Sequence, residues 1–278
     1  MSEHLPEYEL YAIRYAMRDA KRSQHFMGGD PHDGPMDMDY FIWVARHRAQ
    51  VYVIDTGFSP EAAQKRRRAF LCHPAEALRQ LDIDPGTVGD VILTHLHYDH
   101  AGNFDDFPAA RFHIQEPEVH FATGRHIRHR YFSSGYEAED IVNVVRLNFA
   151  RRVMLYVGAV DVAPGIRLEP VPGHSPGQQA VCVHTARGWV VIASDAAHYF
   201  ENVQRHRPYP AACNVVEMID SFDRLLHLAG DIEHIIPGHD PLVMQVYPPA
   251  RPGLEGKAAR LDTAPAPLPE RKPARRAS

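Results

Sequence analysis

The run T-H-L-H-Y-D-H at residues 94–100 carries four side chains that commonly bind metals. Imidazole nitrogens and carboxylate oxygens are accepted as ligands by divalent metal ions. Side chains of an extended segment repeat every second residue, so His95 and His97 point the same way, and the turn that follows adds Asp99 and His100. A pair of divalent metals lowers the pKa of bound water to about 7 and so provides hydroxide at neutral pH. The motif therefore predicts a metal-dependent hydrolase.

Three more donors follow apolar runs that resemble strands: His174 in P-G-H-S-P-G, Asp195 in V-V-I-A-S-D-A and His239 in I-I-P-G-H-D-P. The main motif is preceded in the same way by V-I-L-T. Donors at strand ends are held by rigid elements, as a metal site requires. Chance would be the better explanation of a lone H-x-H pair, but repeated strand-then-donor patterns argue against it. The predicted ligands are His95, His97, Asp99, His100, His174, Asp195 and His239.

The elements expected to position these donors are sheets interrupted by helices. Apolar patterns predict strands over residues 8–15, 38–44, 51–54, 91–94, 111–115, 166–171, 180–184, 190–194 and 234–236. Helices are predicted over residues 74–81, 116–123, 137–149 and 215–228, the last with clear amphipathic spacing. We expect residues 1–247 to form a single domain of the α/β class that carries the hydrolase activity. The Pro, Ala, Lys and Arg-rich residues 248–278 lack periodicity and are expected to be disordered.

The composition favours small-molecule chemistry. A net charge of −5 gives no general attraction for nucleic acid or for anionic membranes. The basic segment 124–130 is interpreted as a solvated helix face, with an anion-binding role as the alternative. Three cysteines without C-x-x-C spacing argue against a disulfide scaffold and against a thiolate zinc site. Neither a secretion signal nor a membrane-spanning run is recognised, so a cytoplasmic location is expected.

The order of the motifs, H-x-H-x-D-H followed by a His, an Asp and a last His, resembles the metallo-β-lactamase superfamily over roughly residues 37–245. The resemblance implies an αββα sandwich, in which two mixed sheets pack face to face with helices outside and two divalent metals lie at one edge. Zinc is expected, with manganese, cobalt and iron as alternatives. Asp55, in I-D-T-G, would steady a ligand by hydrogen bonding, or would simply form a turn. The resemblance assigns His95, His97 and His174 to the first metal, Asp99, His100 and His239 to the second, and Asp195 to both.

The flanks of the donors are most similar to those of the N-acyl homoserine lactonases, which open the ring of bacterial signalling lactones. Zinc β-lactamases, in contrast, carry Cys at the position of Asp195 or lack a bridging carboxylate. The lactonases commonly carry Tyr three residues after the bridging Asp, where its hydroxyl helps to hold the substrate carbonyl. Here His198 occupies that position and Tyr199 follows. The resemblance implies a lactone or ester substrate, Asp99 as proton carrier to the leaving alkoxide, and His198 or Tyr199 at the carbonyl oxygen.

Other activities on the same scaffold stay open. One is hydrolysis of a thioester or amide, as in glyoxalase II-like members, and another is iron-dependent redox chemistry. A binding protein that has lost activity is a third interpretation, but its signature would be a missing ligand, and all seven are present. The expected partner is a small lactone or ester substrate, and neither nucleic acid nor a membrane is expected as a partner. A homodimer is compatible with this interpretation of the sequence.

Overall fold

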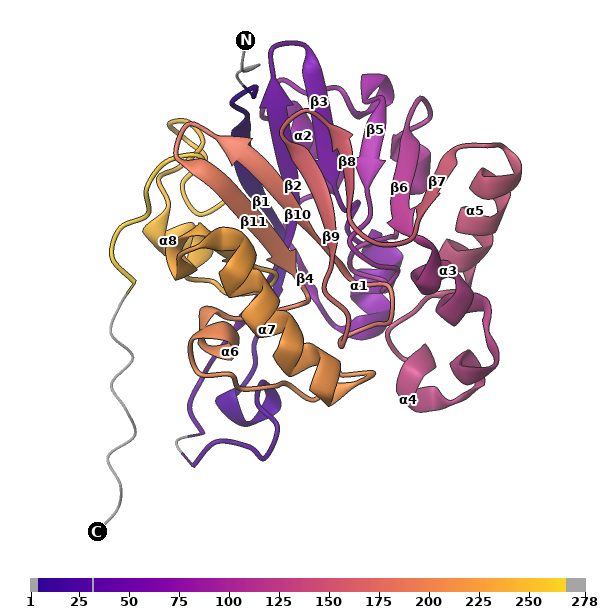
Figure 1. Ribbon diagram of the computed structural model, residues 1–278, viewed down its shortest axis with the longest axis vertical. Helices are drawn as coiled ribbons and strands as arrows, with labels where there is room; N and C mark the ends of the chain where they lie inside the picture. The colour runs from indigo at the N-terminus through magenta and orange to yellow at the C-terminus, as the bar shows by residue number, and fades with distance from the viewer. Residues whose placement is uncertain (1–4, 32, 269–278) are drawn as a thin grey trace.

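The computed structural model describes residues 5–31 and 33–268, which form two β-sheets with helices on their outer faces (Figure 1). The first sheet has the order β13-β1-β2-β3-β5-β6-β7, with β4 paired to β1, and the second has the order β12-β11-β10-β9-β8. The strands are β1 (Glu9–Arg18), β2 (Met38–His47), β3 (Gln50–Ile54), β4 (Ala69–Phe70), β5 (Asp90–Ile92), β6 (Arg111–Gln115), β7 (Val153–Tyr156), β8 (Val160–Ala163), β9 (Ile166–Pro170), β10 (Gln179–Thr185), β11 (Gly188–Ser194), β12 (Ile235–Pro237) and β13 (Ala258–Arg260). The α-helices are α1 (Pro60–Arg66), α2 (Pro74–Arg79), α3 (Glu116–Thr123), α4 (Arg130–Ser133), α5 (Ala138–Phe149), α6 (Phe200–Gln204), α7 (Val215–Ala229) and α8 (Val243–Val246). Short 3₁₀ helices span η1 (Arg22–Gln24), η2 (Pro85–Thr87), η3 (Phe104–Asp106), η4 (Arg125–Arg128) and η5 (Ile232–His234).

The side chains of β2 show why the sheets pack in layers. Successive residues of a strand point to opposite faces of its sheet. Tyr40, Ile42 and Val44 therefore join a buried cluster shared with α2, α3 and α5. Phe41 and Trp43 face the other way and join the cluster that β9, β10 and β11 contribute from the second sheet. An apolar strand with both faces buried thus lies between a helical layer and a second sheet.

Helix α7 covers the outer face of the second sheet. Met218, Phe222 and Leu225 lie on one side of the helix and are buried against that sheet. The side chain of Asn214 accepts hydrogen bonds from two backbone N–H groups of the first turn, and Gly230 ends the helix with a φ of 72°. The sequence prediction of this helix is confirmed.

The two sheets are mixed, since β3, β5, β6 and β7 run parallel and most other neighbours are antiparallel. Helices lie on both outer faces, which confirms the predicted αββα sandwich. Within the described residues, no helix has the length and apolar character needed to cross a membrane.

The structure differs from the expectation of a disordered segment beyond residue 247. Strand β13 pairs with β1, with Ala259 opposite Ala12. Leu254 and Leu261 are buried. A strand of three residues needs no periodic pattern of its own when it pairs with an existing sheet edge, so composition misjudged this part of the chain. Residues 269–278 of the expected tail lie outside the described residues.

Candidate metal centre

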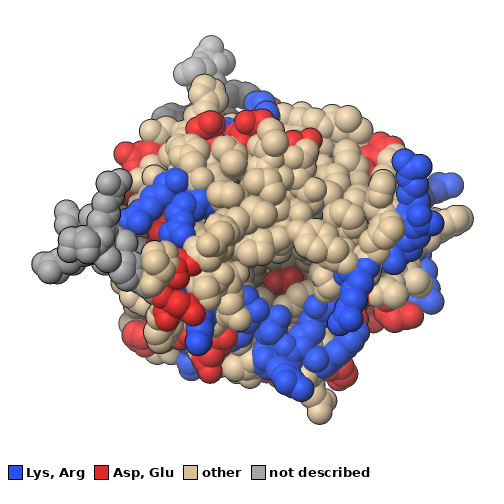
Figure 2. All heavy atoms as spheres, turned by 90° about the horizontal axis from the view of Figure 1, so that it is seen from below, with Lys and Arg blue, Asp and Glu red and all other residues tan. Residues whose placement is uncertain are grey.

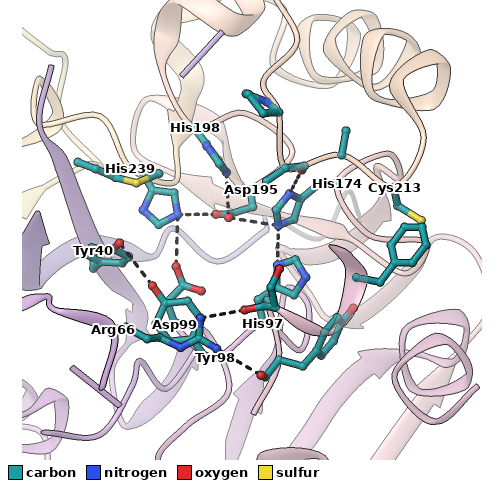
Figure 3. A pocket seen from close by; sticks show the side chains of 18 of the residues that line it. Tyr40, Arg66, His97, Tyr98, Asp99, His174, Asp195, His198, Cys213 and His239 are labelled. Atoms are coloured by element: carbon teal, nitrogen blue, oxygen red, sulfur yellow. Dashed lines mark hydrogen bonds and ion pairs between the residues drawn. The ribbon is translucent and has the colours of Figure 1, made fainter. Parts of the chain in front are cut away.

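The seven predicted donors lie together at one end of the sandwich, where strands of both sheets end. Figure 3 labels five of them: His97, Asp99, His174, Asp195 and His239. The run 95–100 follows β5 of the first sheet, whereas His174, Asp195 and His239 follow β9, β11 and β12 of the second. Strands β9 and β11 are both antiparallel to β10, and β12 is parallel to β11. Their carboxyl ends therefore meet at one edge, facing the loop that the first sheet contributes.

The first donor group consists of three imidazoles, His95, His97 and His174. The Nε2 atom of His174 lies 2.7 Å from Nδ1 of His97 and 3.2 Å from Nε2 of His95. The ring of His174 stands nearly perpendicular to both other rings. Three ring nitrogens thus converge on one point, which is the arrangement expected of a three-histidine metal site.

The second donor group adds two carboxylates, and its members are Asp99, His100, Asp195 and His239. Oδ1 of Asp195 lies 3.0 Å from Nε2 of His239 and 3.2 Å from Nε2 of His100. Its other oxygen, Oδ2, lies 3.4 Å from Nε2 of His174 in the first group. Asp195 therefore presents one carboxylate oxygen to each group, as a bridging ligand must.

The donor atoms fit divalent metal ions because several of them have no other partner. Among the described residues, the buried atoms His100 Nε2 and Asp195 Oδ1 contact only other members of the donor group and have no hydrogen-bond partner outside it. The outer Nδ1 atoms are occupied: His174 Nδ1 lies 2.6 Å from the Ala211 carbonyl oxygen and His239 Nδ1 lies 2.7 Å from the Asp39 carbonyl oxygen. A carbonyl oxygen can only accept a hydrogen bond, so each of these rings must carry its hydrogen on Nδ1. The lone pair on Nε2 then points toward the donor group.

The electrostatic environments of the two groups differ. Burial lowers the pKa of His95 and of His97 well below the usual value, and lowers that of His174. Burial alone would also lower the pKa of His100, but the carboxylates around it, Asp195 first, raise that pKa well above its usual value. Burial would raise the pKa of Asp195, but the neighbouring imidazoles lower it well below the usual range. The first group is therefore a neutral set of donors, and the second is a set of coupled opposite charges.

Asp55 lies behind the second group at the end of β3. Its Oδ2 lies 2.7 Å from Nδ1 of His100, and Oδ1 accepts a hydrogen bond of 2.7 Å from the Thr94 backbone N–H. The residue has a φ of 62°, a conformation that Asp and Asn tolerate better than most residues. The carboxylate thus orients the His100 ring and ties it to the strand end before the motif, as the resemblance implied for this position.

A buried carboxylate, Glu118 of α3, joins the ligand loops of the two sheets. Its Oε1 accepts hydrogen bonds from the Leu96 backbone N–H at 3.1 Å and from the Tyr136 hydroxyl at 3.0 Å. Its Oε2 accepts one from the Gly177 backbone N–H at 3.0 Å. A Cβ atom at Gly177 would lie 2.3 Å from the Glu118 backbone nitrogen, so only glycine allows this close approach. Sequence reasoning missed Glu118, because a single acidic residue in a predicted helix gives no signal of such a role.

A pocket of about 420 Å³ opens onto the donors, and its lining includes Asp99 and His198. Nε2 of His198 lies 3.1 Å from Oδ2 of Asp195, and these two residues form a further potential metal-binding group with His174. Tyr199 is not brought to the pocket. Its fully buried hydroxyl lies 3.0 Å from Nε2 of His25 on the N-terminal side of the molecule. The structure thus separates the two predicted carbonyl-binding candidates.

Tyr209 is a pocket neighbour that the sequence did not reveal. Its ring stacks on that of His198 with centroids 3.7 Å apart, and its hydroxyl donates a hydrogen bond to the Asp195 backbone carbonyl. Tyr209 stands between two prolines, without periodicity or a motif to mark it. It fixes the imidazole that lies beside the Asp195 carboxylate.

The basic segment 124–130 forms η4 and the start of α4, and its arginine side chains are exposed. None of its residues lines the pocket. These positions agree with the interpretation of this segment as a solvated surface.

A model of the metallo-beta-lactamase superfamily matches residues 38–250. An N-acyl homoserine lactonase from Bacillus cereus is 29% identical over 133 residues, which are 48% of this chain and 48% of that protein, so the chain spans about half the length of the curated relatives it matches. A probable metallo-hydrolase from Mycobacterium tuberculosis is 25% identical over 155 residues, 54% of this chain and 50% of that protein. Among solved structures, a quorum-quenching N-acyl homoserine lactone lactonase has a TM-score of 0.71 at 23% identity, covering 85% of this chain and 93% of that one. Together with the fold and the donor geometry, the family match shows that this chain belongs to the metallo-β-lactamase superfamily.

Proposed function

We propose that this protein is a binuclear metal-dependent hydrolase that opens a lactone or ester ring, of the N-acyl homoserine lactone type. The observation that carries the proposal is the placement of the two Asp195 oxygens, one toward each donor group. Curated relatives named as N-acyl homoserine lactonases support the choice of substrate class. We propose zinc as the metal, since imidazole and carboxylate donors suit it.

Two divalent metals held by these groups would polarise the substrate carbonyl and supply a nucleophile at neutral pH. His95, His97 and His174 would hold one metal, and Asp99, His100 and His239 the other. Asp195 would be shared.

Asp99 is the residue best placed to move a proton. Its carboxylate lines the pocket, and its Oδ2 lies 3.7 Å from Nε2 of His239 and 3.8 Å from Nε2 of His100. We propose that Asp99 accepts the proton of the attacking nucleophile and delivers it to the alkoxide that leaves when the ring opens. No separate side-chain base is then required.

His198 would act beside the carbonyl oxygen. Burial lowers its pKa to about 3, so the ring is neutral at pH 7 and has a single N–H group. The contact of 3.1 Å between its Nε2 and Asp195 Oδ2 directs that N–H toward the bridging carboxylate. His198 would therefore orient Asp195 and form one wall of the carbonyl site. Tyr199 has no such place, because its hydroxyl is held by His25.

The decisive experiment combines metal analysis with a substrate panel. The purified protein should contain two divalent metals per chain and should open N-acyl homoserine lactones, adding the mass of one water. His97→Ala should abolish turnover, whereas His227→Ala, an exposed imidazole on α7, serves as the matched control. Activity on thioesters alone would favour the glyoxalase II-like alternative. One bound iron without a second metal would contradict the binuclear hydrolase.

A further inference from the structure

The pocket that opens onto the donors is bordered by positive charge. Figure 2 shows a hollow with acidic atoms at its floor and Lys and Arg side chains along its border. Arg18 at the end of β1, Arg66 at the end of α1, and Arg68 just before β4 contribute to the lining. Arg66 already has an ion-pair partner, since its guanidinium lies 2.8 Å from the carboxylate of Glu137, which it shares with Lys65. The other two arginines require a separate explanation.

Arg18 and Arg68 have no ion-pair partner within residues 5–31 and 33–268. The Nε atom of Arg18 is buried and has no hydrogen-bond partner among those residues. Arg68 Nε donates to the Tyr98 hydroxyl at 3.1 Å, and its Nη1 donates to the Arg66 carbonyl at 2.8 Å. Both acceptors are neutral, so neither offsets the charge of the guanidinium. The Asp99 carboxylate and the Tyr40 ring attract the Arg68 guanidinium from a distance, the ring centroid lying 5.9 Å away, but neither forms an ion pair with it. Both partly buried guanidinium groups therefore lack a direct ion-pair partner, which is costly.

The fold places these two cations beside each other. Strands β1 and β4 are antiparallel, with Met17 opposite Ala69. Arg18 directly follows Met17 and Arg68 directly precedes Ala69, so the two arginines flank the last residue pair of this ladder, and both line the pocket. Like charges in this position repel, and an anion between them would turn the repulsion into attraction.

Two tyrosines separate the arginines from the donor groups. The Tyr98 hydroxyl, which accepts from Arg68, lies 3.4 Å from the Tyr40 hydroxyl. The Tyr40 ring stands edge-on to the ring of His239, with centroids 5.1 Å apart. All of these residues line the same pocket. A substrate with its reacting bond at the donors would therefore reach the arginines with another part of its structure.

We propose that Arg18 and Arg68 bind a compact oxyanion, a carboxylate or a phosphate, on the part of the substrate remote from the hydrolysed bond. This inference rests on the proposed hydrolase function and narrows its substrate class. An unsubstituted N-acyl homoserine lactone is neutral and offers the pair no counter-charge. Guanidinium groups bind carboxylate and phosphate oxygens through paired, charge-assisted hydrogen bonds, so the pair would select for anionic lactones or esters.

The test uses matched substrates on the metal-loaded full chain. One N-acyl homoserine lactone carries a terminal carboxylate on its acyl chain, a second carries a terminal phosphate, and a third carries the neutral methyl ester. We expect kcat/KM to be about tenfold to a hundredfold higher for one of the anionic substrates than for the ester. Arg18→Gln and Arg68→Gln should remove most of this preference, measured within each variant as the ratio of kcat/KM for the anionic substrate to kcat/KM for the neutral ester. Arg146→Gln removes an exposed charge on α5 and should change nothing. The larger preference, carboxylate or phosphate, identifies the anion.

A binding measurement separates this inference from the proposed function. Adipate, 6-phosphooxyhexanoate and monomethyl adipate are titrated calorimetrically into the wild-type protein and into the Arg18→Gln/Arg68→Gln double variant. Tighter binding of a probe with two anionic groups, adipate or 6-phosphooxyhexanoate, supports the anion site if the double variant loses it, even when no lactone is hydrolysed. That combination would overturn only the proposed function. Equal binding of the three probes to the wild type, or equal turnover of the three lactones, would overturn the anion site. The wild-type comparison alone decides this, so the result does not depend on whether a variant folds.

Discussion

The two donor groups share one carboxylate but differ in charge and in what surrounds them. His95, His97 and His174 form a group of neutral imidazoles whose pKa values burial lowers. The other group combines carboxylates with His100, whose pKa those carboxylates raise. A metal in the first group would replace few protons, whereas a metal in the second would neutralise a charged network. The difference in charge indicates two metal sites of unequal affinity. Each of the following substitutions or changes of pH should affect the two sites either equally or differently.

The largest effect is expected from Asp195→Ala. Because the two oxygens of this carboxylate face different groups, its removal should release both metals. The loss of kcat/KM should then far exceed the loss of about 10–100-fold that is typical when a residue hydrogen-bonded to a metal ligand is replaced. Mass-spectrometric metal analysis and lactone turnover would measure this. Asp220→Ala, an exposed carboxylate on α7, is the matched control. Retention of both metals would show that Asp195 is not shared.

The single-group variants His97→Ala and His239→Ala should each reduce the metal content by one equivalent. Each residue belongs to only one of the two groups, so the remaining metal should stay bound. We expect kcat/KM to fall by at least about 100-fold in both, above the effect of a residue behind the ligands. Metal content per chain after dialysis is the measurement. If either variant lost both metals, the two groups would behave as one cooperative site.

Asp55→Asn should weaken only the second group. Asn tolerates the φ of 62° at this position, but its NH₂ group cannot accept the Nδ1–H of His100. Metal affinity there should fall by about 10–100-fold, with the first group unchanged. Competition with a chromophoric chelator would resolve the two affinities. Asp84→Asn, an exposed N-cap residue, should have no such effect, and an equal loss at both sites would contradict the assignment.

The smallest effect is expected in the pH dependence of metal affinity, which should differ between the two groups. In the metal-free protein the raised pKa of His100 keeps its ring protonated at neutral pH, so metal must displace that proton. Binding at the second group should weaken by about tenfold for each unit that the pH falls, as one-proton competition requires. The imidazoles of the first group are already unprotonated at pH 7, so their affinity should stay constant into the acidic range. Chelator titrations between pH 6 and 8 would test this, and parallel pH profiles would refute it.

The donor set could be predicted because its signals are local. His95 and His97 alternate after an apolar run, and each later donor lies in the loop just after a strand of the second sheet, so sequence order indicated where they meet. The arginines of the pocket could not be predicted, because Arg18 and Arg68 become neighbours only through the pairing of β1 with β4. Strands β7 and β8 were missed for a different reason: each has only four residues, and none of these residues is buried. Local sequence patterns do not predict a residue's role when that role depends on contacts between distant segments.

Glu118 bears on when the centre becomes ordered. One carboxylate holds the Leu96 backbone of the first ligand loop and the Gly177 backbone beside the second. The entropy lost in fixing these loops is therefore lost during folding of the chain and not when an ion arrives. The ligand cage would then be present before metallation, and binding would need little rearrangement. The same link makes the loops a single cooperative unit, so opening one would release the other.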